Sequence, residues 1–125
     1  MKLVKEIPLE NDLTVRFYNH NHRYFGDYHR VKVEITCEVP IMEEYFSNRA
    51  ECAEAISTLG RSALFKRGVE QMGVSSDELE PCLERIIDNF ISHALSYLAS
   101  PEFPRMLIKK EMANSMRTVR GTYPG

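Results

Sequence analysis

The spacing of apolar residues changes once along the chain, and that change limits the folds available to it. Residues 2 to 40 alternate between apolar and polar side chains and are rich in Val, Ile, Thr, Phe and Tyr, which predicts β-strands with one buried face. After Pro40 the apolar residues recur every three or four positions, as in amphipathic helices. The sequence therefore predicts an α+β fold: an N-terminal three-stranded antiparallel β-meander packed on one face by three to four C-terminal α-helices.

The first turn signal fixes one hairpin register. A loop over residues 10 to 12, Glu-Asn-Asp, sets Ile7 opposite Val15. Since side chains alternate between the two faces of a strand, one face then collects the apolar residues and becomes the core side. We expect these residues on it: Leu3, Ile7, Leu9, Leu13, Val15 and Phe17.

The second turn allows two registers, and a slip of one residue sends a strand's apolar side chains to the other face. A three-residue loop at 25 to 27 pairs Phe17 with Ile35 and keeps the odd-numbered residues of both strands on the core side. A two-residue turn at Gly26 and Asp27 suits type II′ geometry but splits the core face. We favour the first register, or the second with a compensating β-bulge.

Three helices are expected after the strands, over about residues 42 to 59, 81 to 99 and 102 to 117. The first should end at Gly60, because glycine is the residue that most often follows a helix. The apolar residues of 61 to 72 follow helical spacing only loosely, and their alternation also allows a short strand. Both interpretations therefore stay open.

The segment VSSDEL, residues 74 to 79, is the strongest signal for a helix start. Ser75 can cap the helix and Glu78 can reach back to complete a capping box. We expect the central helix that follows to lie against the odd-numbered sheet face. Residues 1 to 125 then form a single α+β domain, with strands over about 2 to 40, helices over about 42 to 117 and a frayed tail over 118 to 125.

Composition indicates an ordinary soluble protein. Hydrophobic residues make up 43% and charged residues 27%, with a net charge of −2, which gives no overall attraction to nucleic acid or anionic lipid. The three cysteines are widely spaced and form no CxxC motif. The N-terminus lacks the apolar core of a signal peptide, and no stretch approaches the roughly 20 apolar residues of a membrane span. We therefore expect a cytoplasmic protein with no membrane association and no cofactor.

The segment NHNHRYFGDYHR, residues 19 to 30, holds three of the four histidines. In the favoured register, aromatic and basic side chains of this region gather on the sheet face turned away from the core. They are Tyr18, His20, His22, Tyr24, Tyr28, Arg30 and Lys32. Such residues are enriched at protein interfaces, and a sheet with free edges can pair with another chain. We therefore expect a non-catalytic protein-interaction or self-association module, whose partner is a second copy of the chain or another protein.

Two alternatives use the same residues. His20 and His22 lie two apart on a strand, about 7 Å from each other on one side, so a metal-dependent or acid/base enzyme could use them with His29 and Asp27. The favoured register, however, turns His29 to the core side near Arg23, and motifs such as HExxH or GxSxG are missing. The other alternative is single-stranded nucleic-acid binding by the aromatic and basic face, which the acidic net charge disfavours.

Overall fold

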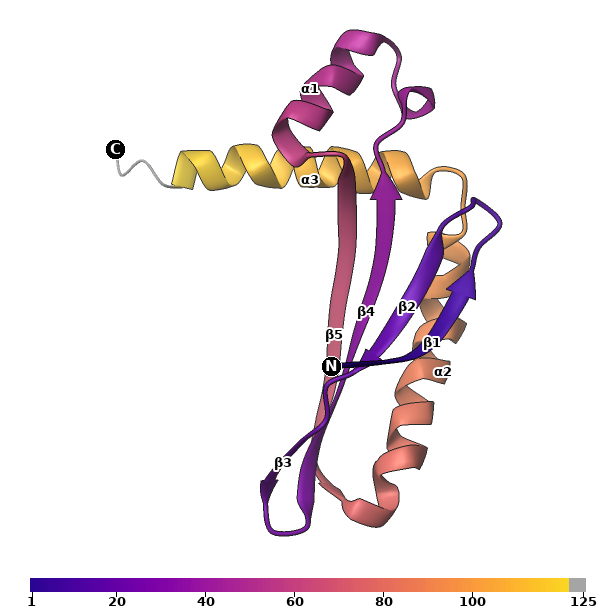
Figure 1. Cartoon of the computed structure of the whole chain (residues 1–125), viewed down its shortest axis with the longest axis vertical. Coiled ribbons are helices and arrows are strands. Elements are labelled where there is room, and N and C mark those ends of the chain that lie inside the picture. Colours follow the sequence, from indigo (N-terminus) through magenta and orange to yellow (C-terminus); the bar gives the residue numbers. More distant parts are fainter. Residues whose placement is uncertain (122–125) are drawn as a thin grey trace. The chain divides into compact units, whose positions relative to one another are not determined.

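The computed structural model of the protein describes the backbone of residues 1–121 and the side chains of residues 1–21 and 26–116. The chain divides into two compact units, which are described in turn (Figure 1). Unit 1 comprises residues 1–37 and 66–100, and unit 2 comprises residues 38–65 and 101–125. The elements are β1 (Lys2–Pro8), β2 (Thr14–Asn19), β3 (His22–Phe25), β4 (Tyr28–Pro40), the 3₁₀ turn η1 (Glu43–Tyr45), α1 (Arg49–Leu59), β5 (Ser62–Ser75), the 3₁₀ turn η2 (Ser76–Glu78), α2 (Leu79–Leu98) and α3 (Phe103–Gly121).

The sheet of unit 1 is antiparallel, so the expected α+β class is confirmed. Strand β1 pairs with β2, and β2 and β3 pair with successive parts of one edge of β4. Strand β5 also pairs with β4, and its side chains contact the same β4 residues that face β2 and β3. Because a strand has two edges, β5 lies on the other edge of β4. It is therefore the outermost strand of the sheet on that side.

The first hairpin has the expected register with one irregularity. Ile7 lies opposite Val15, as predicted. A shift between Leu3 and Lys5 then sets Leu3 opposite Tyr18. The expectation that Leu3 faces the core is therefore wrong, since the bulge turns its side chain to the other face and leaves it 42% exposed.

The second hairpin combines a two-residue turn with a β-bulge. Gly26 adopts a positive φ of 54°, and the pairing shifts between Arg23 and Phe25. Beyond the shift, Phe17 lies opposite Ile35. The bulged form of the expected register is confirmed, and the odd-numbered residues of β2 and β4 share one face.

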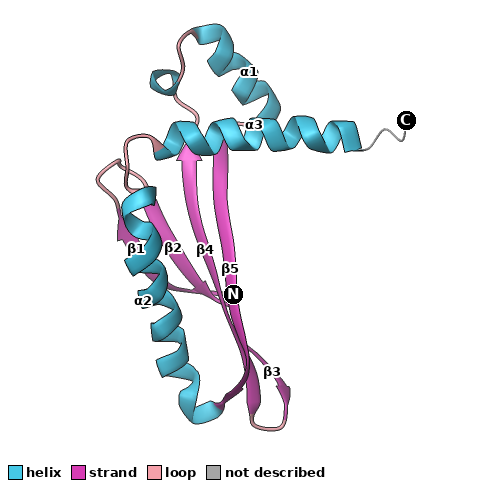
Figure 2. Ribbon diagram, turned by 180° about the vertical axis from the view of Figure 1, so that it is seen from behind, coloured by secondary structure: helices cyan, strands magenta, loops and turns pink. Residues whose placement is uncertain are grey.

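Helix α2 packs against that odd-numbered face (Figure 2). The rings of Phe17 and Phe90 meet edge to face, with centroids 5.8 Å apart. The buried residues of this core include Val15, Phe17, Val31, Val33, Ile35 and Cys37 from the sheet and Cys82, Leu83, Ile86, Ile87, Phe90 and Leu98 from the helix. Asn11 fastens the first loop to the end of α2, because its Nδ2 donates to the carbonyl oxygens of Leu98 at 2.8 Å and Ser100 at 3.0 Å.

The first helix is shorter than expected. Residues 43–45 form a 3₁₀ turn, and α1 begins at Arg49. Asn48 sets this start, since its side-chain oxygen accepts a hydrogen bond from the backbone N–H of Glu51 at 2.9 Å. Gly60 ends the helix with a φ of 88°, as expected.

Residues 62–75 form the long strand β5, so the strand interpretation of residues 61 to 72 is the correct one. Among the described residues the sheet has five strands where three were expected, because β5 is added and the expected second strand is divided into β2 and β3. At its end, Ser75 donates to the carboxylate of Asp77 at 2.8 Å and caps no backbone group. The expected capping box does not form, and the turn η2 precedes α2 instead.

In unit 2, helices α1 and α3 pack on each other, and α3 carries the buried residues Phe103, Leu107 and Ile108. The ring of Phe103 meets that of Phe65 edge to face, with centroids 5.9 Å apart. Helix α3 continues to Gly121, beyond the expected end at residue 117. Of the expected frayed tail, residues 122 to 125 lie outside the described residues. No helix within residues 1–121 has the length and apolar character needed to cross a membrane.

Candidate functional site

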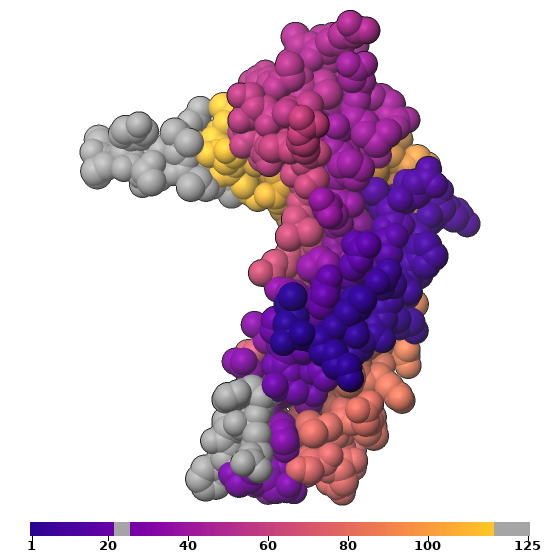
Figure 3. Space-filling model, viewed as in Figure 1, coloured from indigo at the N-terminus to yellow at the C-terminus, as the bar shows by residue number. Residues whose placement is uncertain are grey.

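The face of the unit 1 sheet opposite α2 carries polar and charged side chains, and we call it the outer face. In the view of Figure 3 the N-terminal strands lie in front, coloured indigo. The residues of the outer face are Arg16 and Tyr18 of β2, His20 directly after β2, Tyr28, Arg30, Lys32 and Glu34 of β4, and Lys66 and Glu70 of β5. Five residues of the expected interaction face belong to it, namely Tyr18, His20, Tyr28, Arg30 and Lys32. The side chains of His22 and Tyr24 lie outside the described residues.

Glu34 is the centre of a three-strand charge cluster on the outer face. Its carboxylate accepts from Lys66 Nζ at 2.9 Å and contacts His20 Nε2 at 3.1 Å. The hydrogen bond from Lys66 is the main cause that lowers the pKa of Glu34, against the opposing effect of partial burial. The sequence singles out His20 but gives no sign that Lys66 joins it at Glu34, because Lys66 comes from a strand 32 positions beyond Glu34.

Other cations of the outer face also lie near carboxylates. Arg30 is 3.8 Å from Glu70, and Arg16 is 3.9 Å from Glu6. Ion pairs this exposed add little to stability. They do offset the positive charge that phosphate groups would need, so the face is a weak match for nucleic acid.

His29 lies away from the outer face. It is opposite Arg23 in the β3–β4 ladder, and its Nε2 is 3.0 Å from Ser76 Oγ. The single hydroxyl proton of Ser76 is donated to Asp27, so His29 must donate to the Ser76 oxygen. A serine held in this way is not activated as a nucleophile, and the contact instead ties the hairpin tip to the start of η2.

The histidines expected for a metal site are therefore not brought together in the described part of the chain. His20 and His29 lie on opposite faces of the sheet. Within residues whose side chains are described, no three His, Cys, Asp or Glu side chains come close enough to hold a metal ion.

No family model, curated protein or solved structure matches the chain. Function is accordingly inferred from the geometry of its surfaces.

Strand β5 presents an open edge. It runs for 14 residues, and β4 is the one strand among the described residues that pairs with it. Within unit 1 most of its side chains are exposed, including Lys66 at 63%, Glu70 at 52% and Met72 at 55%. An edge of this length exposes a row of backbone N–H and C=O groups that can pair with another strand.

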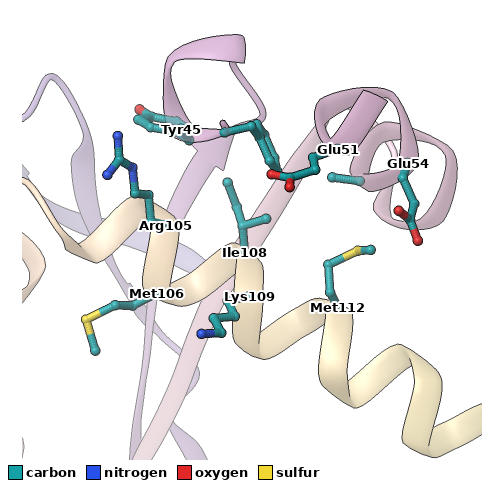
Figure 4. Close-up of a pocket in the computed structure, with 10 residues that line it drawn as sticks. Tyr45, Glu51, Glu54, Arg105, Met106, Ile108, Lys109 and Met112 are labelled. Carbon is teal, nitrogen blue, oxygen red and sulfur yellow. The ribbon is translucent and has the colours of Figure 1, made fainter. Parts of the chain in front are cut away.

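Unit 2 holds a pocket of about 520 Å³ between α1 and α3 (Figure 4). Ile108 and Met112 project from α3 toward α1, and Glu51 and Glu54 stand on the α1 side. Arg105 lies at the other end, where its Nη2 donates to the carbonyl oxygen of Glu44 at 3.2 Å.

The three cysteines are free and buried. Cys37 lies in the sheet core, where desolvation raises the pKa of its thiol to about 11. A thiol that stays protonated and enclosed is a poor nucleophile, so Cys37 belongs to the packing of unit 1.

Proposed function

We propose that the protein is a non-catalytic self-association module that joins two copies of the chain through the sheet of unit 1. The observation that carries this proposal is the open edge of β5. Folded proteins shield long strand edges with proline, charged side chains, β-bulges, short strands or covering segments. On β5 the charges of Lys66 and Glu70 lie near opposite charges on β4, so they repel a second strand less than unpaired charges would. Residues 66–75 include no proline and keep an extended, mostly exposed strand.

The outer face supports the same function. Its charges are arranged as cross-strand pairs around Glu34 and Arg30, which suits a surface that continues across a second sheet better than one that gathers substrate. Tyr18 and Arg30 are residue types enriched at protein interfaces. The buried free thiols support our placing the protein in a reducing cytoplasm.

The expected strength is modest. Pairing of one edge strand per copy buries less surface than the roughly 1,200 Å² of a standard stable interface. Complexes of that size are weak and reversible, so we expect dissociation constants in the micromolar range.

Sedimentation velocity and light scattering of the full chain between about 1 and 500 µM test the proposal. The mass should rise from that of one chain toward that of two. Met72→Lys, which adds a charge to the exposed edge, should shift the rise to higher concentration. Met106→Lys is the matched control, because Met106 is similarly exposed at 50% but lies on α3 of unit 2. A single-chain mass over the whole range would refute the proposal.

A further inference from the structure

The part of β5 that belongs to unit 1 begins with Lys66, Arg67, Gly68, Val69 and Glu70. We infer that a second copy of the chain pairs antiparallel with this strand, with Gly68 of one copy opposite Gly68 of the other, so that the two sheets become one. The pairing rests on the self-association proposed above and specifies where, and in which register, the copies meet.

Symmetry limits the registers that can form. Two identical antiparallel strands in one continuous sheet are related by a two-fold axis perpendicular to it. Directly opposed residues point to the same face, so an even-numbered residue of one copy must face an even-numbered residue of the other. The axis therefore passes through a single residue position of β5, and each position gives a different set of opposed side chains.

Charge selects among these positions. With the axis at Gly68, Lys66 of each copy lies opposite Glu70 of the other, which gives two opposite-charge pairs. With the axis at Arg67 or at Glu70, two like charges face each other, which is unfavourable. With the axis at Val69, Lys66 lies opposite Met72 of the other copy. Lys66 then no longer has the oppositely charged Glu70 as its partner.

The pairing also continues charge rows already present on the outer face. Within one copy, Lys66 contacts Glu34 at 2.9 Å and Glu70 lies 3.8 Å from Arg30. In the Gly68 register, each row of charged side chains crosses both sheets with alternating sign. It runs from Glu34 and Lys66 of one copy to Glu70 and then Arg30 of the second copy. Lys66 and Glu70 are 63% and 52% exposed in one copy, so both can reach a second partner.

Cysteine cross-linking tests the register directly. The Cα atoms of opposed residues are about 4.5–5.5 Å apart, which a disulfide can span. The site tolerates a side chain, because a Cβ added at Gly68 would meet only ordinary contact with Lys32 Cε at 3.7 Å. Under mild oxidation at a concentration where dimers form, Gly68→Cys should give a covalent dimer on a non-reducing gel.

Met72→Cys is the matched control. It lies on the same strand and is 55% exposed, but in this register the two introduced thiols would be about 27 Å apart along the strands. It should therefore cross-link no more than the wild type, whose three cysteines are buried. Circular dichroism verifies that both variants fold.

A charge reversal provides the second measurement. Glu70→Lys turns both opposite-charge pairs into like-charge pairs and should raise the dissociation constant about tenfold or more. Glu84→Lys makes the same change on the exposed side of α2 and should change it less than twofold. Dimers that Gly68→Cys fails to cross-link would overturn the register and leave self-association standing, whereas a monomer at every concentration would overturn both.

Discussion

Replacing Phe90 with alanine should remove a large part of the stability of unit 1. Phe90 is 7% exposed, and its ring meets that of Phe17 edge to face at 82° with centroids 5.8 Å apart. Truncating a buried phenylalanine typically costs about 3–5 kcal/mol, because apolar contact is lost and a cavity remains. Of that, about 0.5–1.5 kcal/mol belongs to the ring pair. A loss of this size is a large fraction of the roughly 5–15 kcal/mol that stabilises a domain.

Urea denaturation followed by far-UV circular dichroism measures the effect, since the chain has no tryptophan to report by fluorescence. Tyr97→Ala is a suitable control, because it removes an aromatic ring from the same helix at a site that is 47% exposed. Its cost should be less than half that of Phe90→Ala. Equal costs for the two variants, or a loss below about 1 kcal/mol for Phe90→Ala, would contradict the packing of α2 on the sheet.

A double-mutant cycle isolates the ring contact. Leucine in place of Phe17 and Phe90, singly and together, keeps apolar bulk at both sites while removing the aromatic pair. We expect a coupling energy of about 0.5–1.5 kcal/mol. Additive losses would show that the two rings do not interact in solution.

Three further outcomes are expected. Asn11→Ala removes the hydrogen bonds that hold the first loop to Leu98 and Ser100 and should destabilise the protein by about 1–2 kcal/mol in urea denaturation. The pKa of Glu34 is lowered in the folded state, chiefly by Lys66, so the stability it adds is present above its ordinary value of 4.5 and is lost as the pH falls through the lower folded value. Glu34→Gln should therefore be less stable than the wild type at pH 7, and this difference in stability should shrink as the pH falls below 4.5. A difference that grows in acid would refute this. With its pKa raised to about 11 by burial, Cys37 should react with iodoacetamide at pH 8 far more slowly in the native protein than in guanidinium chloride, as mass spectrometry would show.

The N-terminal strands could be predicted in detail because two independent signals agree. Period-two alternation fixes which residues face the core, and the turn residues fix where each strand reverses. Together they set Phe17 opposite Ile35. The bulge at Leu3 could not be predicted because no turn residue marks it in the sequence. It is visible only as a shift in the pairing of β1 with β2 between Leu3 and Lys5.

The sequence left residues 61 to 72 open between helix and strand for a physical reason, which lies in strand β5 itself. It lies at a sheet edge, where few side chains are buried, and within it only Ala63 and Val74 are fully enclosed. The apolar residues Leu64, Val69 and Met72 are spaced much as on a helix face. Without a buried face there is no period-two signal, and the charge cluster that depends on this strand stayed hidden with it.

The core of unit 1 joins segments that are made far apart in time. Phe17 and Phe90 are separated by roughly 70 residues, and a ribosome adds about 5–20 residues per second. The strand that carries Val15 and Phe17 therefore waits about 4–15 s before the helix that covers it has been synthesised. During translation this apolar sheet face therefore stays uncovered until α2 has been made, and the speed of codon decoding over residues 38 to 90 sets for how long.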